Sequence, residues 1–330
     1  MASEDQIGRF RRDLESLTGG TPVAIGLAVS GGPDSLALLL LANAACPGLV
    51  RAATVDHGLR PESADEARFV AGLCSGLGVP HAILLAPGAI GGASVQAQAR
   101  ALRYRMLGDW AGEHGLAWIA TAHHMDDQAE TVLMRLARGS GLAGLSSVRA
   151  RRAAVPAAIV RPLLGWRRSE LASIVEQAGI AAVDDPSNRC EHFDRTRFRA
   201  LLARTDALPV PRLAASASHL AEAEEALEWA AEREWQERAA VRENCVSLDP
   251  AGLPPELVRR LAARAVGEVH GDREWRSDKL AAALAQVATG GRVNIAGVRI
   301  SGGDRWRFEP EPPRRSVAGG ADSNSDRIVR

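Results

Sequence analysis

The sequence predicts an α/β protein: an N-terminal domain built on a parallel sheet with helices on both faces, followed by a smaller α+β domain. From residue 21 to about 125, short apolar runs alternate with helix-like segments. Continuous apolar runs of strand length are typical of strands buried on both faces of a parallel sheet. After Leu208 the chain changes to a long glutamate-rich helix and later to strands, which indicates a second domain.

Each element of the first domain follows from this alternation. The runs expected to be strands are residues 21–30, 50–56, 81–86, 116–122 and 157–164. The segments between and after them that are expected to be helices are residues 34–45, 61–78, 94–115, 126–139 and 167–179. Residues 139–152 are expected to form a flexible loop, and residues 182–199 a polar loop that runs into a helix.

The second domain is predicted to begin with the glutamate-rich helix and to continue with helices from Pro254 and over residues 277–290. Strands are expected over residues 292–300 and 304–310. We therefore expect domains at residues 1–207 and 208–311, and a disordered polar tail at residues 312–330.

Composition excludes several classes of protein. The chain has 330 residues, 46% hydrophobic and 24% charged, which is typical of a soluble globular protein. The longest apolar stretch, from Leu36, is too short to span a bilayer, and the charged N-terminus lacks a secretory signal. Four scattered cysteines without a C-x-x-C pair fit a reducing compartment, so a cytoplasmic location without membrane contact is expected.

Almost all of the basic residues are arginine. The net charge is zero, and Lys279 is the only lysine among 40 basic residues, so arginine abundance alone is weak evidence for nucleic-acid binding. A Walker A loop requires a lysine after its second glycine, and no glycine loop here contains one.

The turn SGGPDS, residues 30–35, joins the first apolar run to a helix. Two glycines at a helix N-terminus allow a phosphate to approach free backbone N–H groups. The Asp34 carboxylate would repel a phosphate unless a cation such as Mg²⁺ lies between them. A plain turn with a capping serine is the alternative interpretation. A dinucleotide fold is disfavoured because the turn lacks G-x-G-x-x-G.

Other polar residues follow the ends of neighbouring strands. Asp56 ends the second run, and the fourth run leads into TAHHMDDQAET. There Asp127, Glu130 and Thr131 are spaced to share one helix face, so His123, Asp127 and Glu130 are expected to face one pocket. Ligands of parallel sheets bind at these carboxyl ends. A non-functional explanation exists for these residues: acidic side chains are favourable in the first turn of a helix. Arg103, in the segment QARALRY, could likewise be only a solvated helix residue.

These motifs together resemble a known family. SGGPDS resembles the pyrophosphate loop of the N-type ATP pyrophosphatases, whose fold is adenine nucleotide α-hydrolase-like. The segments VDHGLRPES, AQARALRYRML, TAHHMDDQAETVLMRLARGSGLAGLSS, RPLLGWRRSEL and DDPSNRCEHFDRTRFR follow in the order seen in the tRNA(Ile)-lysidine synthetase family. The resemblance covers residues 22–204. It implies ATP-dependent ligation of L-lysine to C2 of the wobble cytidine of a CAU-anticodon isoleucine tRNA, through an adenylated cytidine, with release of AMP and pyrophosphate.

The resemblance also implies the site. Catalytic roles fall on Asp34, Arg103, His123, Asp127 and Glu130. ATP contacts fall on Ser30, Gly31, Gly32, Asp34, Ser35, Asp56 and His57, with Asp34 reaching Mg²⁺ through ATP. Lysine or tRNA contacts are expected at Asp126, Arg138, Asp185, Asn188, Arg195 and Arg199. A homodimer is also expected, because dimers are common in the family.

Residues 138–204 contain twelve arginines and six acidic residues. A solvated helix face is the default interpretation of such a segment, but a basic segment beside an adenylation site favours contact with an anticodon stem. Two alternatives stay open: a small-molecule adenylating enzyme such as an amide synthetase, and a non-catalytic tRNA-binding protein with a degenerate loop.

Overall fold

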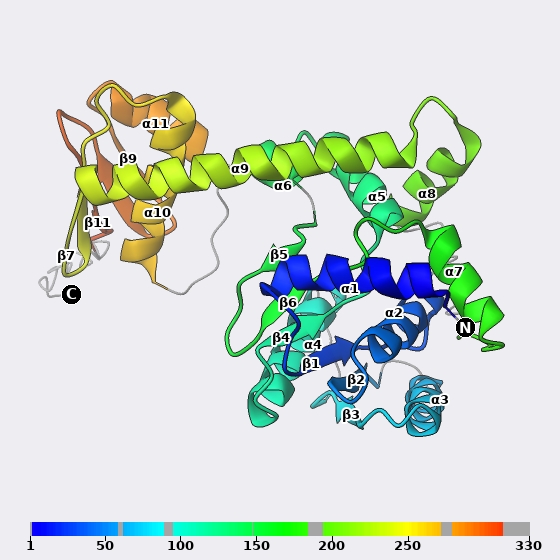
Figure 1. The fold of residues 1–330 in the computed structure, drawn as a ribbon. Coiled ribbons are helices and arrows are strands. Elements are labelled where there is room, and N and C mark those ends of the chain that lie inside the picture. Colours follow the sequence, from blue (N-terminus) through cyan, green and yellow to red (C-terminus); the bar gives the residue numbers. More distant parts are fainter. Residues whose placement is uncertain are drawn as a thin grey trace, which may run out of the picture. The chain divides into compact units, whose positions relative to one another are not determined.

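The computed structural model describes residues 2–58, 62–88, 95–146, 148–183, 194–271 and 279–312. The chain divides into two compact units, Met1–Glu224 and Glu225–Arg330 (Figure 1). The division falls within the long helix α9 (Val210–Arg238), whereas the sequence placed a domain boundary at residue 207, just before this helix. Apart from Pro312, the expected disordered tail lies outside the described residues.

The first unit contains a six-stranded sheet in the order β3-β2-β1-β4-β6-β5. Its strands are β1 (Ile25–Ala28), β2 (Val50–Asp56), β3 (His81–Leu85), β4 (Trp118–Ala120), β5 (Arg151–Arg152) and β6 (Ala158–Val160). All neighbouring pairs are parallel except β5 with β6. The five predicted strands and the parallel sheet are confirmed. The short edge strand β5 lies in the segment that was expected to be a flexible loop.

The helices of this unit are α1 (Glu4–Thr18), α2 (Pro33–Ala45), α3 (Ser63–Gly76), α4 (Val95–Glu113), α5 (Met125–Leu136), α6 (Leu142–Leu145), α7 (Arg168–Gln177) and α8 (Asp194–Arg204). Neither α1 nor α6 was predicted from the sequence. The signal for α1 was present, because Ser3 and Gln6 form a capping box at its start.

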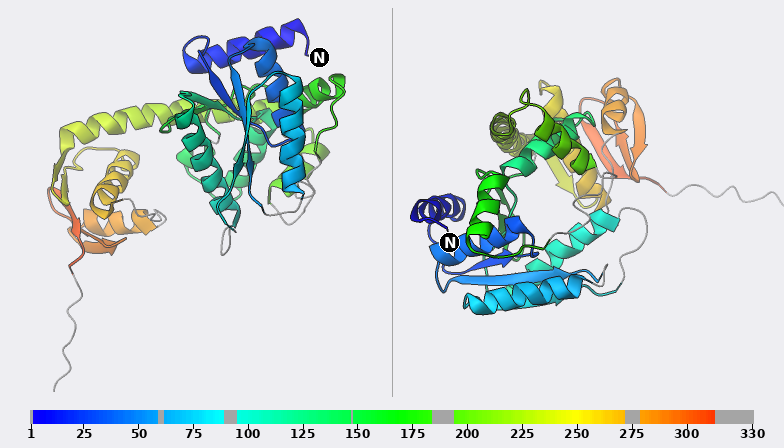
Figure 2. Two further views of the ribbon diagram at one scale, coloured as in Figure 1. Left: turned by 90° about the horizontal axis from the view of Figure 1, so that it is seen from below. Right: turned by 90° about the vertical axis from the view of Figure 1, so that its right-hand side faces the viewer.

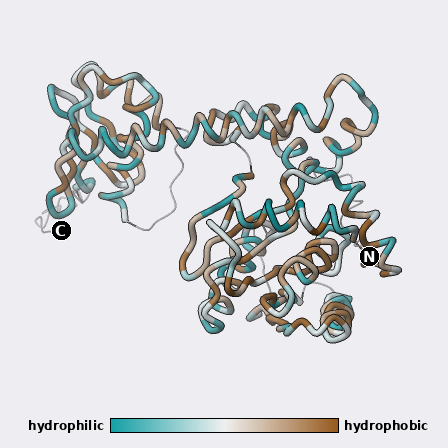
Figure 3. Tube along the Cα trace, viewed as in Figure 1, coloured by the Kyte–Doolittle hydropathy of each residue, from teal (hydrophilic) through white to brown (hydrophobic). Residues whose placement is uncertain are grey.

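Helices cover both faces of this sheet (Figure 2). One face packs against α1, α2, α3 and α7, with Phe10 and Trp166 fully buried there. The other face packs against α4, which buries Leu107 and Trp110. Helix α2 is apolar nearly all round, as its colouring in Figure 3 shows, because it lies between the sheet and the helices α1 and α7.

The strand order determines where a ligand can bind. The chain leaves β1 for β2 on one side, whereas β4 lies on the other side of β1 and connects onward to β6. Crossovers that leave two adjacent strands in opposite directions open a crevice at the carboxyl ends of those strands. The glycine turn follows β1 and the His123–His124 pair follows β4, so both motifs lie at this point.

The second unit has a five-stranded antiparallel sheet in the order β7-β8-β11-β10-β9. Its strands are β7 (Ala239–Arg242), β8 (Cys245–Leu248), β9 (Arg292–Ile295), β10 (Val298–Ser301) and β11 (Trp306–Pro310), and they pack against α10 (Pro255–His270) and α11 (Leu280–Ala288) around buried Phe308. This confirms an α+β region, although β7 and β8 were not predicted. In the described parts of both units, no helix combines the length and apolarity needed to cross a membrane.

Candidate active site

The glycine turn is held by a small hydrogen-bond network at the start of α2. Leu36 N donates to Gly32 O at 3.0 Å, which is the first bond of the helix. The N–H groups of Asp34 and Ser35 precede it and therefore have no acceptor within the helix. Ser35 Oγ accepts from Ser30 N at 3.1 Å and donates to Gly32 O at 2.9 Å. The turn thus presents N–H groups at the positive end of a helix dipole, as an anion site requires.

Gly31 is the position in this turn where a side chain is least tolerated. Its φ is +85°, a left-handed conformation that favours glycine. A Cβ built there would lie 3.1 Å from Val183 Cγ2 and 3.3 Å from Val70 Cγ2. The backbone bond from Val183 N to Gly31 O, 3.1 Å long, keeps Val183 close. The loop conformation therefore depends on glycine at this position.

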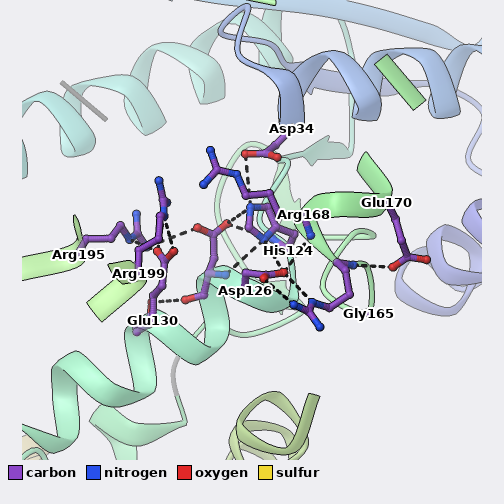
Figure 4. A network of polar contacts seen from close by, with 12 residues as sticks. Asp34, His124, Asp126, Glu130, Gly165, Arg168, Glu170, Arg195 and Arg199 are labelled. Carbon is purple, nitrogen blue, oxygen red and sulfur yellow. Dashed lines mark hydrogen bonds and ion pairs between the residues drawn. The ribbon is translucent and has the colours of Figure 1, made fainter. Parts of the chain in front are cut away.

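His124 joins the turn after β4 to the turn after β1 (Figure 4). It is the N-cap residue of α5, and its Nδ1 accepts from Asp127 N at 3.3 Å. Its Nε2 lies 3.4 Å from Asp34 Oδ2 and 3.6 Å from Asp127 Oδ2. The ring is 1% exposed, so these contacts are made in a largely dehydrated environment. His124 was not predicted as a site residue from the sequence. The available signal was the capping-box spacing between His124 and Asp127.

Nearby charges shift the pKa values of both His124 and Asp127 in this cluster. Burial alone would lower the pKa of His124, but the neighbouring carboxylates, that of Asp34 first, raise it. Burial would raise the pKa of Asp127, but His124 and Arg195 lower it below its usual range. Asp127 therefore stays ionised beside the glycine turn.

Asp34 has one oxygen available for a ligand. Oδ2 faces His124, whereas Oδ1 is buried and makes no hydrogen bond to any residue that the structure describes. A carboxylate oxygen without a partner beside a phosphate-binding turn fits Mg²⁺, which binds one or two carboxylates together with substrate phosphates. The described residues contain no cluster of three or more His, Cys, Asp or Glu side chains suited to a metal.

His123 lies on the opposite side of the same turn. Its Nδ1 is 2.9 Å from Thr121 Oγ1 and accepts from Arg161 Nε at 3.4 Å. Burial and the nearby Arg161 lower the pKa of His123 to about 3. The ring is therefore neutral near pH 7. Since arginine can only donate, Nδ1 is the acceptor and Nε2 carries the hydrogen. This tautomer offers the site a hydrogen-bond donor rather than a base. Arg161 follows β6 and is 5% exposed; the sequence analysis did not select it.

Glu130 is held by two arginines of α8. Its Oε1 accepts from Arg199 Nε at 2.7 Å, and its Oε2 lies 3.3 Å from Arg195 Nε. The Glu130 side chain is 2% exposed, while those of Arg195 and Arg199 are 43% and 32% exposed. Arg195 also lies 4.0 Å from Asp127 Oδ1. The pair of arginines thus fastens α8 to α5 beside the glycine turn, as Figure 4 shows.

Asp126 faces away from this pair and binds the start of α7. Its Oδ2 accepts from Arg168 N at 2.9 Å and from Arg167 Nε at 3.2 Å. A carboxylate at a helix N-terminus is favourable both as a hydrogen-bond acceptor and against the helix dipole. Asp126 therefore connects α5 to α7, a contact different from the substrate contact expected from the sequence.

Asp56, His57 and Arg103 form a second group, at the end of β2. Asp56 Oδ1 accepts from Gly58 N at 2.9 Å and from Ser63 Oγ at 2.6 Å, and these bonds lower its pKa. Arg103 Nε donates to His57 Nε2 at 3.4 Å. Burial and Arg103 lower the pKa of His57, and its Nδ1 is buried with no partner in the described part of the chain. His57 is therefore a neutral imidazole whose Nδ1–H is available to donate a hydrogen bond to a ligand.

The other expected contacts are placed as follows. Arg138 is exposed just beyond the end of α5. Asp185 and Asn188 lie outside the described residues. The structure therefore brings Asp34, Asp127, Glu130, Arg195 and Arg199 together in one cluster, with His123 alongside and Arg103 paired to His57.

The parallel sheet, the glycine turn at its switch point and the available Asp34 oxygen define an ATP-using domain of the pyrophosphate-loop class. In agreement, the family described as PP-loop domain matches residues 4–205. A solved structure, the U34-tRNA thiolase NcsA from Methanococcus maripaludis, has a similar fold, with a TM-score of 0.54 and 18% identity over 66% of this chain and 78% of that one.

Closer relatives identify the particular family. The tRNA(Ile)-lysidine synthase of Novosphingobium aromaticivorans is 48% identical over 316 residues, 93% of this chain and 94% of its own length. That of Zymomonas mobilis is 45% identical over 297 residues, 89% of this chain and 90% of its own. The chain belongs to the tRNA(Ile)-lysidine synthase family.

Proposed function

We propose that this protein is an ATP-dependent ligase that joins L-lysine to C2 of the wobble cytidine of a CAU-anticodon isoleucine tRNA. The observation that carries the proposal is identity of 45% and 48% to two tRNA(Ile)-lysidine synthases over nearly the whole chain. The pyrophosphate loop and its carboxylate agree with an ATP-using first step.

In the first step, the C2 oxygen of the cytidine attacks the α-phosphorus of ATP; an O–P bond forms and the bond to pyrophosphate breaks. The N–H groups at the start of α2 bind the departing pyrophosphate, and Asp34 Oδ1 would hold Mg²⁺. When bound, Mg²⁺ neutralises negative charge on the phosphates. His123 Nε2–H and Arg103 donate hydrogen bonds toward developing negative charge.

In the second step, the lysine amine attacks C2; a C–N bond forms, the C–O bond breaks, and AMP leaves. Asp127 is a better candidate than Glu130 to hold a lysine ammonium group. The nearest described cation to Asp127 Oδ1 is Arg195 at 4.0 Å, whereas Glu130 Oε1 accepts from Arg199 at 2.7 Å. The amine must lose a proton. Since the pKa of His123 is lowered to about 3, an ionised carboxylate or water is the better acceptor.

The RNA contact is proposed for the basic face of α8. Arg195 is 43% exposed even though it contacts Glu130, so it can also meet a phosphate. Arg197, on the same helix, is exposed as well. Backbone phosphates of an anticodon stem would be bound there electrostatically.

The test is AMP release by the purified protein with ATP, Mg²⁺ and L-lysine, with a CAU-anticodon isoleucine tRNA transcript and without RNA. AMP that appears only with this tRNA, together with labelled lysine in the RNA, is the expected result. AMP release without RNA would replace the proposal with a small-molecule synthetase. An absence of AMP under both conditions would favour a tRNA-binding protein. Light scattering of the same sample tests the homodimer.

A further inference from the structure

We propose that His124 is a positioning residue: its Nε2–H holds Asp34 so that the carboxylate presents Oδ1 to the magnesium of bound ATP. The proposal deepens the proposed function, because it concerns the metal-binding step of the same site. It assigns a role to the second histidine of the TAHHMDD motif, which the mechanism above does not use.

Two different atoms of the His124 ring make two different contacts. Nδ1 accepts from Asp127 N at 3.3 Å and so caps α5. When Nδ1 accepts from Asp127 N, the ring is neutral and carries its hydrogen on Nε2; a protonated ring would keep the Nε2 hydrogen but lose the Nδ1 contact. Nε2 therefore donates toward Asp34 Oδ2, 3.4 Å away, in either case.

The ring is rigidly placed, whereas Asp34 is not. His124 is 1% exposed and begins a helix that is also fastened to α7 through Asp126. The Asp34 side chain is 29% exposed, and its other oxygen has no partner among the described residues. We expect loss of the His124 contact to let the Asp34 carboxylate change its orientation, because His124 lies against Oδ2.

The contact also joins the two strands that define the ligand crevice. Asp34 stands in the first turn after β1, and His124 stands directly before the helix that follows β4. This contact links the two turns between which ATP is proposed to bind. Side chains that hold a metal ligand in this way commonly affect metal affinity by about 10–100-fold.

Two substitutions separate the two contacts. Asn is a favoured N-cap residue, so His124→Asn keeps an acceptor for Asp127 N but has no atom that reaches Asp34. Gln is longer, so His124→Gln provides an N–H near the position of Nε2. The measurement uses the full-length protein: Mn²⁺ binding by electron paramagnetic resonance with a non-hydrolysable ATP analogue, the affinity of that analogue in EDTA, and thermal unfolding.

We expect His124→Asn to weaken Mn²⁺ binding about tenfold. The affinity for the analogue in EDTA and the unfolding temperature should stay close to those of the wild type. His124→Gln should recover part of the Mn²⁺ affinity. Adding His124→Asn to Asp34→Asn should cause no further loss, because the contact acts through Asp34.

Wild-type Mn²⁺ affinity in His124→Asn would overturn the proposal and leave His124 as a helix cap. So would equal weakening of analogue binding with and without metal, since that would show a general distortion of the loop. These measurements need neither tRNA nor lysine, so they stand even if the tRNA-dependent AMP assay fails.

Discussion

The contact between Glu130 and Arg199 distinguishes two roles for Glu130. The family resemblance implies a catalytic role for Glu130, which could include contact with lysine, whereas the structure shows both of its oxygens facing arginines of α8. If the main role of Glu130 is to hold α8, then Glu130→Gln should reduce the stability of the protein and leave the KM for lysine within about twofold of the wild type. If Glu130 binds the lysine ammonium, the KM should rise with little change in stability.

The magnitude follows from burial. Removing one member of a fully buried ion pair costs about 3–5 kcal/mol, and exposed pairs are worth about 0–1 kcal/mol. Glu130 is 2% exposed but Arg199 is 32% exposed, so an intermediate coupling of about 1.5–2.5 kcal/mol is expected. Arg195, which lies farther from the carboxylate at 3.3 Å and is 43% exposed, should couple by about 1 kcal/mol or less.

The assay is a double-mutant cycle with Glu130→Gln, Arg199→Met and the double variant, followed by urea unfolding at low salt. Arg195→Met is the matched control, because it removes an arginine from the same helix. A Glu130–Arg199 coupling below about 0.5 kcal/mol, or one no larger than that of Arg195, would refute the reasoning. An increase in the KM for lysine at unchanged stability would restore Glu130 as a substrate contact.

Three further predictions concern neighbouring residues. Gly31→Ala should lower the free energy of unfolding by about 1–2 kcal/mol in urea titrations and weaken ATP binding, because φ is +85° and Val183 crowds a Cβ; a neutral effect would contradict this. Asp56→Asn should cost about 1 kcal/mol at pH 7. The pKa of Asp56 is lowered by folding, so its contribution is present above about pH 4 and is lost as pH falls through the folded pKa. The gap between the urea midpoints of variant and wild type should therefore narrow as pH falls below about 4, and a constant gap would argue otherwise. Asp127→Asn should raise the KM for lysine about tenfold in steady-state assays, the effect of about 1.4 kcal/mol, with Asp126→Asn, which removes a carboxylate that contacts α7, as the control on the same helix; an unchanged KM would exclude the ammonium contact.

Much of the fold could be predicted from the chain alone. The apolar runs that became β1 and β4 are continuous, so their composition and length identify buried parallel strands. Elements with weak local signals were missed. β7 and β8 carry the sequence AAVRENCVSL, in which charged residues interrupt the alternation, and they form strands because β11 and a covering helix provide pairing and burial.

The candidate site divides in the same way. Local sequence was enough to predict the anion-binding turn, because Gly31, Gly32 and Asp34 act through backbone geometry and helix position within a few residues. It also placed Asp127 and Glu130 on one face of a helix by spacing, with His123 just before that helix. Local sequence could not show that Arg199, 69 residues away, donates a hydrogen bond to Glu130, because that contact depends on how α8 packs.

What the sequence by itself determined is therefore the class of chemistry: the pyrophosphate loop, the order of its accompanying motifs and the parallel sheet that carries them. Only the tertiary structure decided which polar atoms are occupied and which are available. The orientation of His124 toward Asp34, the Nδ1 bond that makes His123 a donor, and the arginines on Glu130 all arise between separate elements. A hydrogen bond or ion pair depends on distances of a few tenths of an ångström and on exclusion of water, and packing fixes both only when distant segments meet.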